Sequence, residues 1–263
     1  MLNQKHAISK WYADMYDQSE TYTDDVDFIL SVIGPQPKNI LEACCGSGRI
    51  LVPLAKAGHT VTGFDADEFM LSKIPAKANG FENIKWHKAD ATSSDWGHGY
   101  DVVILAGNIL FNIVSDMEYE KAQELFIQKA ADALVSGGYV YIAYNPGGHK
   151  LTQPGQSVEY DGSIAWSWEG TDSNGNTGKA AIRSGSYDAD TGIDKFTRIF
   201  ELTLATGEKI QQETACKKHF ATLGQIHEWL ENAGFVIELE CENFDKKPVD
   251  DNSCSLIIYA RKK

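Results

Sequence analysis

The chain has 263 residues, of which 43% are hydrophobic and 23% charged, and its formal net charge is −13. This length allows one large domain or one domain with an insertion, since compact domains commonly hold about 100–200 residues. No apolar run approaches the roughly 18 residues of a membrane helix, and the polar start resembles no signal peptide, so we expect a cytoplasmic protein with no membrane partner. The acidic excess opposes nucleic-acid binding.

The cysteine pattern argues against cross-links. There are five cysteines, two of them adjacent at Cys44 and Cys45, and none lies in a CxxC pair. An odd number without paired spacing is atypical of a disulfide framework or a zinc knuckle. We therefore expect reduced thiols and no metal site.

Strand-like and helical segments alternate through the first half of the chain. In order we expect a helix over 22–34, strands over 39–44, 60–65, 83–90 and 100–107, a helix over 117–135 and a fifth strand over 138–145. Such alternation is typical of βαβ units and a parallel sheet. The nearly uninterrupted apolar run at 100–107 predicts a strand buried on both faces.

The pattern changes near residue 149. From there to residue 218, period-two alternation and turn sequences predict an antiparallel sheet of about four strands. A helix over 222–234 and two further strands then restore the first pattern. We expect an α/β fold, a doubly wound, mostly parallel seven-stranded sheet with a reversed last strand, built from residues 1–148 and 219–263. Residues 149–218 form the antiparallel β insertion.

Three carboxylates mark the ends of three successive predicted strands. Glu42 begins the segment EACCGSGR, which closes the first strand and opens into a helix, while Asp65 and Asp90 end the next two. The carboxyl ends of parallel strands share one edge, where open α/β sheets bind ligands. Taken singly, Asp65 and Asp90 have the alternative of serving as turn or cap residues.

Residues 11 to the end, except the insertion, resemble the class I S-adenosylmethionine-dependent methyltransferases with their Rossmann-like sheet. The segment ILEACCGSGRILVPLAKAGHTVTGFDADEFML is similar to the first two cofactor motifs of that family, and DATSSDW to the segment beside the adenine. The resemblance implies S-adenosylmethionine as cofactor and S-adenosylhomocysteine as product. It also implies methyl transfer to an oxygen or nitrogen of a small-molecule acceptor.

The resemblance further assigns cofactor-binding positions. It places Cys45, Gly46 and Gly48 against the methionine part of the cofactor and Glu42 near the methionine amine. It places Asp65 and Ala66 at the ribose and Asp90 and Ala91 near the adenine. Leu105 would lie beside the cofactor. In WYADMYD, Tyr12 and Tyr16 would close over the carboxylate, with packing of the helix as the alternative. Cys44 stands where a glycine is usual, and we expect it to be shielded within the first strand with a negative φ.

The sequence identifies fewer candidate residues for the acceptor site than for the cofactor site. Asn108, after the fourth strand, is the candidate polar group, and His149 and His219, which bracket the insertion, are candidate bases or ordinary junction residues. No base is required for an acceptor that arrives unprotonated.

The insertion supplies a candidate substrate lid. Alternation predicts one shared face for Ile164, Trp166 and Trp168, and another for Phe196, Arg198 and Phe200. We expect this apolar bulk to build the acceptor pocket, with a homodimer surface as the alternative.

Other functions have weaker support in the sequence. A nicotinamide oxidoreductase needs G-x-G-x-x-G, and the third glycine is missing here. A non-catalytic S-adenosylmethionine sensor and a methyltransferase acting on protein or RNA stay open as alternatives, although the net charge disfavours RNA.

Overall fold

The computed structural model describes residues 4–146, 148–152 and 155–263. The chain divides into two compact units, each considered by itself: Tyr22–Gly155 with Phe220–Lys263, and Met1–Thr21 with Gln156–His219. The N-terminal segment thus groups with the antiparallel sheet, whereas the sequence division assigned it to the α/β part. Within the described residues, no helix is both long and apolar enough to cross a bilayer.

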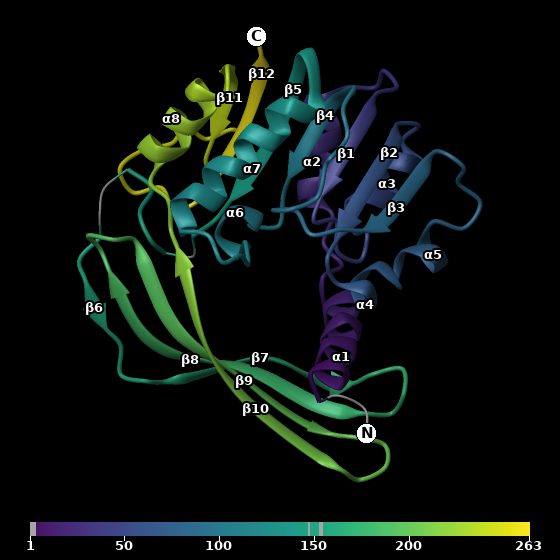
Figure 1. The fold of residues 1–263 in the computed structure, drawn as a ribbon, viewed down its shortest axis with the longest axis vertical. Helices are drawn as coiled ribbons and strands as arrows, with labels where there is room; N and C mark the ends of the chain where they lie inside the picture. The colour runs from purple at the N-terminus through teal and green to yellow at the C-terminus, as the bar shows by residue number, and fades with distance from the viewer. Residues whose placement is uncertain (1–3, 147, 153–154) are drawn as a thin grey trace. The chain divides into compact units, whose positions relative to one another are not determined.

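The larger unit is built on a seven-stranded sheet in the order β3-β2-β1-β4-β5-β12-β11 (Figure 1). Its strands are β1 (Asn39–Ala43), β2 (Thr60–Asp65), β3 (Ile84–Lys88), β4 (Tyr100–Leu105), β5 (Leu134–Tyr144), β11 (Phe235–Cys241) and β12 (Leu256–Lys262). The first five pair in parallel, and β12 is antiparallel to both of its neighbours. The predicted mostly parallel sheet with a reversed last strand is confirmed.

Helices join these strands. They are α2 (Asp24–Ile33), α3 (Leu51–Lys56), α4 (Glu68–Leu71), α5 (Ile74–Lys77), α6 (Ile109–Asn112), α7 (Tyr119–Ala133) and α8 (Leu223–Asn232). Helix α2 ends at Gly34, whose φ of 80° is a conformation that favours glycine. Helix α8 begins with a capping box between Thr222 and Gln225. Thr23 holds the N-cap position of α2, but its hydroxyl makes no capping bond.

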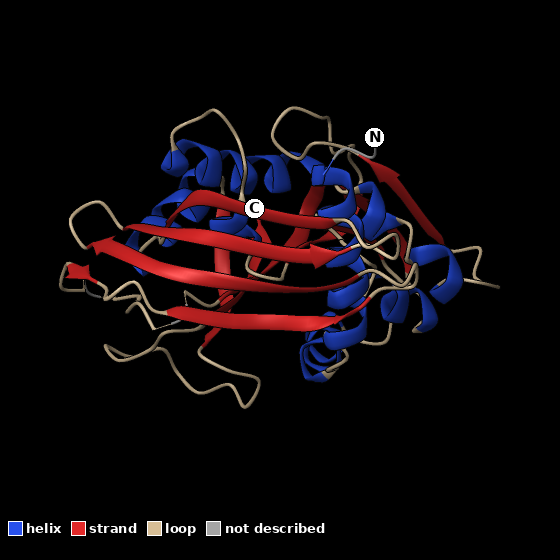
Figure 2. Ribbon diagram, turned by 90° about the horizontal axis from the view of Figure 1, so that it is seen from below, coloured by secondary structure: helices blue, strands red, loops and turns tan. Residues whose placement is uncertain are grey.

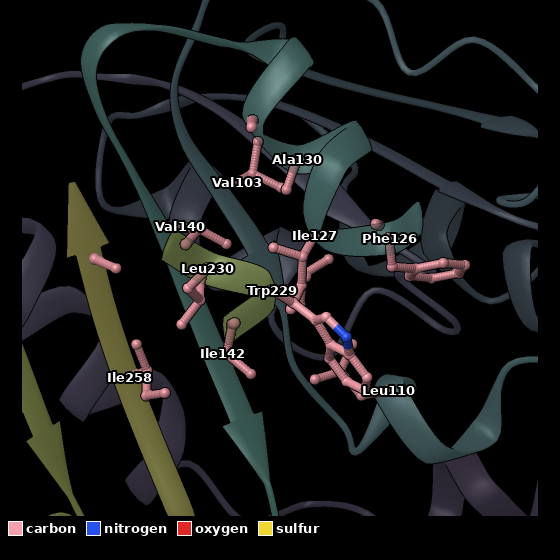
Figure 3. Packing of buried hydrophobic residues seen from close by; sticks show 14 of the residues in the cluster. Val103, Leu110, Phe126, Ile127, Ala130, Val140, Ile142, Trp229, Leu230 and Ile258 are labelled. Carbon is pink, nitrogen blue, oxygen red and sulfur yellow. The ribbon is translucent and has the colours of Figure 1, made fainter. Parts of the chain in front are cut away.

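Both faces of the sheet are covered by apolar cores. Along β4, Val103 and Leu105 join one core and Val102 and Ile104 the other. Helices α7 and α8 supply the first core, with Phe126, Ile127, Trp229 and Leu230 among its members (Figure 3). Alternation across a doubly covered strand explains why the four positions from Val102 to Leu105 are all apolar.

The smaller unit is an antiparallel sheet with the N-terminal helix packed on it. Its elements are α1 (Gln4–Ser19), β6 (Val158–Glu159), β7 (Ile164–Thr171), β8 (Thr177–Asp188), β9 (Ile193–Thr203) and β10 (Lys209–His219). Strand order is β10-β9-β8-β6, with β7 also pairing with β8, and Figure 2 shows the long strands side by side. The four predicted strands are the long ones, and β6 is an additional short strand.

A β-bulge corrects one prediction about this sheet. The register of β7 with β8 shifts between Trp166 and Trp168, so these side chains lie on opposite faces. Trp168 packs with the helix, whereas Trp166 is 46% exposed and lies under the Lys179 ammonium. The prediction that both tryptophans share a face with Ile164 was therefore wrong. The shared face of Phe196, Arg198 and Phe200 is confirmed by their pairing with β10.

Candidate cofactor and acceptor site

The turn after β1 leaves its backbone open to a ligand. Gly46 and Gly48 have φ values of 52° and 77°, a region that side chains rarely adopt. A Cβ added to Gly46 would meet nothing within 4 Å, whereas one on Gly48 would come within 2.9 Å of Ile74. Gly48 therefore permits close packing of the turn, and Gly46 leaves free space beside it.

Cys44 departs from its predicted conformation. The strand ends at Ala43, and Cys44 lies in the following turn with φ of 59°, only partly buried. A left-handed residue here reverses the chain direction at the strand end, which explains why glycine is the more common choice. Burial raises the pKa of the thiol, and nearby Asp65 adds to that rise, so the group is a neutral thiol.

Asp65 connects β2 to this turn. Its two carboxylate oxygens accept hydrogen bonds from the backbone N–H groups of Gly46 at 2.9 Å and Asp67 at 2.8 Å. These two bonds are those of a turn residue, which was the alternative that the sequence left open for Asp65. Each oxygen keeps a further lone pair for a ligand hydroxyl.

Glu42 is the most deeply buried charge-bearing group at the site. It is 5% exposed, and its Oε2 atom has no hydrogen-bond partner among the residues that the structure describes. Burial raises its pKa to about 8; Arg49 opposes this rise and Asp65 adds to it. A buried carboxyl without a partner is costly, so a cationic or donor group placed beside it would be stabilised.

Sequence reasoning missed the ion pair beneath the turn. Arg49 and Asp25 form two hydrogen bonds of 2.7 and 2.6 Å with both side chains nearly buried. The Arg49 guanidinium also lies 4.3 Å from the Tyr22 ring centroid. The pair ties the start of α2 to the end of the glycine turn. The only sequence signal was an arginine directly after the GSG segment.

Asp90 lies beyond its predicted strand. Strand β3 ends at Lys88, and the exposed Asp90 carboxylate accepts bonds from Thr92 and from the Ser93 backbone. These bonds lower its pKa. The arrangement is that of a turn residue, which was the alternative for this position. Its neighbour Ala91 is buried, and the adenine role of both residues stays a prediction.

The loop after β4 holds Asn108 in an unusual backbone conformation. Its φ is 62°, and its side-chain oxygen accepts a 2.6 Å bond from the backbone N–H of Asn145, which follows β5. This bond fixes the side chain between two adjacent strand ends and leaves the amide NH₂ group able to donate. Leu105, at the end of β4, is fully buried.

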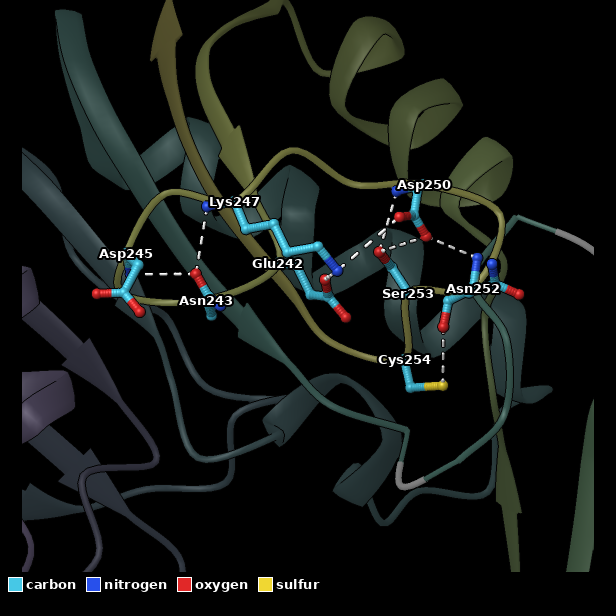
Figure 4. A network of polar contacts seen from close by, with 8 residues as sticks. All are labelled: Glu242, Asn243, Asp245, Lys247, Asp250, Asn252, Ser253 and Cys254. Carbon is cyan, nitrogen blue, oxygen red and sulfur yellow. Dashed lines mark hydrogen bonds and ion pairs between the residues drawn. The ribbon is translucent and has the colours of Figure 1, made fainter.

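A cavity of about 270 Å³ opens beside Asn108. It is bounded by the start of α2, the ends of β4 and β5, the start of β12 and the loop between β11 and β12. In that loop, Lys247 donates to Glu242 at 2.6 Å, and Asn243 accepts from the backbone of Asp245 and Lys247 (Figure 4). The polar network therefore fixes Glu242 and Asn243, which form one wall of the cavity.

The remaining predicted site residues have local partners. Tyr12 and Tyr16 lie 4.5 and 5.9 Å from the Trp168 ring, which is the packing alternative for this helix. His149 stacks near Phe220 at 4.4 Å, and burial lowers its pKa. His219, at the end of β10, is buried. Their roles toward cofactor or acceptor stay predictions, as does that of Ala66.

These features fit S-adenosylmethionine. The molecule carries an ammonium and a sulfonium, which suit the unpartnered Glu42 oxygen and the acidic surroundings of the turn. Its ribose hydroxyls suit the spare lone pairs of Asp65. Open space over Gly46 admits the ligand to the backbone.

Comparisons with known proteins find methyltransferases. Residues 40–138 match the family described as methyltransferase domain. Over 117 residues the chain is 26% identical to a 23S rRNA (uracil(1939)-C(5))-methyltransferase of Aeromonas salmonicida, covering 38% of this chain and 27% of that protein. A putative methyltransferase of a Geobacillus species is 30% identical over 116 residues, covering 43% of this chain and 47% of that protein. The chain thus spans between a quarter and a half of these relatives.

Solved structures match nearly the whole chain. The CcbJ methyltransferase of Streptomyces caelestis has a TM-score of 0.67 at 19% identity, covering 97% of this chain and 98% of that one. A methyltransferase from Clostridium acetobutylicum has a TM-score of 0.68 at 15% identity, covering 95% and 97%. The sugar N-methyltransferase KedS8 from Streptoalloteichus has a TM-score of 0.66 at 17% identity, covering 92% and 87%.

The fold and the matched segment define the class. Residues 40–138 are similar to a methyltransferase domain, and the chain as a whole shares the fold of solved methyltransferase structures.

Proposed function

We propose that this chain transfers the methyl group of S-adenosylmethionine to a nitrogen or oxygen of a small molecule. The observation that carries the proposal is the convergence of Glu42, Gly46 and Asp65 at the ends of β1 and β2. One Glu42 oxygen is buried there and has no partner within the described part of the chain. An orphan carboxylate oxygen beside open backbone is a preformed site for a cationic ligand.

Each group has a distinct task in this proposal. Asp65, with Ala66 beside it, binds the ribose, and Glu42 holds the methionine amine. Cys45, Gly46 and Gly48 line the methionine part, while Asp90, Ala91 and Leu105 border the rest of the cofactor. When bound, S-adenosylmethionine supplies an electrophilic methyl group on a sulfonium.

The acceptor side requires alignment more than acid–base chemistry. In-line displacement removes the sulfonium charge in the transition state, so positioning and exclusion of water provide much of the rate. Asn108 is placed to orient an acceptor, because its side chain is anchored by Asn145 and borders the cavity. His149 is neutral near pH 7 since burial lowers its pKa, and it is our candidate for taking up a proton.

Whole-chain similarity favours a small acceptor. The structure of the sugar N-methyltransferase KedS8 aligns over 92% of this chain, including an antiparallel sheet region outside the shared domain. An RNA acceptor is the second candidate, because an rRNA methyltransferase is 26% identical over 117 residues. The net charge of −13 opposes RNA binding.

Incubation with methyl-labelled S-adenosylmethionine tests the function. The acceptor panel contains amino sugars, alkylamines, phenols and ribosomal RNA, and S-adenosylhomocysteine formation is measured beside label transfer. We expect transfer to a small acceptor and a large loss of kcat in Asn108→Ala with little change in cofactor affinity. Cofactor binding without turnover on any acceptor would support a sensor, and transfer to RNA alone would support the second candidate.

A further inference from the structure

The cavity beside Asn108 is lined by acidic and aromatic side chains. Its walls include the carboxylates of Asp25 and Glu242 and the rings of Tyr22 and Phe244, and the described lining contains no lysine, arginine or histidine. All of these residues belong to the larger unit. A molecule in this cavity therefore meets anionic and aromatic groups, a combination that favours a cation.

The two carboxylates of the lining differ in their hydrogen bonds. Both oxygens of Asp25 accept bonds from the Arg49 guanidinium, at 2.7 and 2.6 Å. In Glu242, Oε2 accepts a 2.6 Å bond from the Lys247 ammonium, and within the described part of the chain Oε1 accepts no hydrogen bond. The Oε1 atom of Glu242 is therefore the carboxylate oxygen that a ligand can use.

The ion pair of Glu242 with Lys247 leaves this capacity intact. The Lys247 side chain is 53% exposed and that of Glu242 is 21% exposed, so the lysine faces water on the outer side of the loop. Ion pairs with such an exposed ammonium are weak, because water competes for the cation. The carboxylate thus stays a strong acceptor toward the cavity.

Aromatic rings stand beside the carboxylate. Phe244, two residues after Glu242, is 41% exposed and lies 5.4 Å from the Phe28 ring, which supports it. Asn243 accepts bonds from the backbone of Asp245 and Lys247 and so fixes the loop (Figure 4). Because the loop is ordered in advance, a ligand does not have to order it on binding.

A metal ion does not suit this cavity. Calcium takes about six to eight oxygen ligands, several of them carboxylates. Among the residues that the structure describes, no group of three or more His, Cys, Asp or Glu side chains is placed to hold a metal ion. An ammonium on an organic molecule needs one strong acceptor and gains from contact with rings, which is what Glu242 and Phe244 offer.

We propose that Glu242 binds the protonated amine of an organic acceptor, so that this cavity selects amines over alcohols and phenols. A hydrogen bond from an ammonium to a carboxylate is about twice as strong as one between neutral groups. The inference rests on the proposed function in taking the bound amine to be the methyl acceptor. Before transfer the ammonium gives one proton to water; the nitrogen lone pair then forms the N–C bond as the C–S bond breaks, and the electron pair of that bond stays on sulfur.

Titration with two small probes tests the site without cofactor or methyl transfer. Benzylamine carries an ammonium near pH 7, and benzyl alcohol has the same ring with a neutral hydroxyl in its place. Binding of each probe to the purified chain is followed by calorimetry at constant ionic strength. We expect saturable binding of benzylamine, at least about tenfold tighter than that of benzyl alcohol.

Glu242→Gln removes the charge of the side chain and keeps its shape. We expect its affinity for benzylamine to fall at least about fivefold and its affinity for benzyl alcohol to stay within about twofold. Asp245→Asn is the matched control, because Asp245 is exposed in the same loop and lies outside the cavity lining. Its affinity for benzylamine should stay within about twofold of that of the unchanged chain.

Lys247→Met separates ligand binding from a structural role of the ion pair. This variant breaks the same Glu242–Lys247 pair as Glu242→Gln does, but it leaves the carboxylate in place. We expect unchanged or tighter binding of benzylamine, because Lys247 no longer competes for the carboxylate. A loop that only needs the ion pair for its structure would lose affinity in both variants.

Three results would overturn the proposal: no saturable binding of benzylamine, equal weakening in Glu242→Gln and Lys247→Met, or equal weakening in Glu242→Gln and Asp245→Asn. Circular dichroism confirms that each variant is folded. Methyl transfer to alcohols or phenols without a preference for amines would also reject the amine site and leave the proposed function standing. Benzylamine binding that depends on Glu242, in a chain that transfers no methyl group, would reject the proposed function and leave the amine site standing.

Discussion

At the residue scale, the protonation of Glu42 links cofactor binding to pH. In the free chain burial raises its pKa to about 8, so the carboxyl is mostly protonated near pH 7. A bound ammonium favours the carboxylate, so the complex has a lower pKa and binding releases a proton. Proton release is largest below pH 8, where free Glu42 is protonated, and it vanishes above pH 8. The affinity for the cofactor therefore increases with pH up to about pH 8.

Calorimetry in buffers of different ionisation enthalpy measures this release. We expect close to one proton released per S-adenosylhomocysteine bound near pH 7, and almost none in Glu42→Gln. Glu238→Gln is the control, because its partner Arg261 lowers the pKa of that exposed carboxyl and keeps it ionised in both states. A buffer-independent enthalpy in the unchanged chain would refute the linkage.

Cys44 provides a second prediction at this scale. Its φ of 59° costs a non-glycine residue about 1–2 kcal/mol. Cys44→Gly should therefore stabilise the fold by about 0.5–1 kcal/mol, after allowing for the greater freedom of glycine in the unfolded chain. Cys44→Val should destabilise it, since β-branched residues tolerate this region poorly.

Urea unfolding followed by circular dichroism gives both values. S-adenosylhomocysteine affinity in Cys44→Gly should change by less than about threefold, well under 1 kcal/mol. Destabilisation by the glycine variant, or metal lost from the protein with that change, would contradict a purely structural role for the thiol.

At the element scale, the bulge in β7 separates two tryptophans that simple alternation places together. Trp168 packs against Tyr12 and the apolar core beneath α1, whereas Trp166 is 46% exposed. Trp168→Ala should cost about 2–3 kcal/mol of stability through lost packing. Trp166→Ala should cost less than about 1 kcal/mol, mostly its contact with Lys179.

Urea denaturation of the two variants compares their losses of stability directly, because both replace a tryptophan with alanine and the two positions are only two residues apart. The signal is intrinsic fluorescence together with far-ultraviolet circular dichroism. Equal losses would show that the two rings share an environment, in conflict with the observed register shift.

At the scale of the whole molecule, much of the fold was predictable because its signals are periodic. The apolar run in β4 and the period-two alternation in residues 149–218 each encode a local structure in the sequence. The positions of Glu42 and Asp65 at the ends of β1 and β2 followed from topology, since parallel strands end at one edge of a sheet, whereas Asp90 lies past the end of β3.

Features that depend on irregular backbone were not predictable. A single extra residue in β7 moves every later side chain to the other face, and nothing at Ser167 marks the bulge. The grouping of α1 with the antiparallel sheet depends on contacts more than a hundred residues apart, such as Trp11 with Gly170. The Arg49–Asp25 pair likewise needs the folded chain to bring its members together.

Calorimetric titration with S-adenosylhomocysteine tests the central claim most directly. Asp65→Ala removes the carboxylate that we assign to the ribose, and Asp95→Ala removes an exposed turn carboxylate that caps the Gly97 backbone. We predict that one molecule binds per chain. Its affinity should be at least about tenfold weaker in Asp65→Ala and unchanged in Asp95→Ala, because the hydrogen bonds lost in Asp65→Ala contribute about 1.5–3 kcal/mol each. Absence of binding, or equal affinity in a folded Asp65→Ala protein, would contradict it.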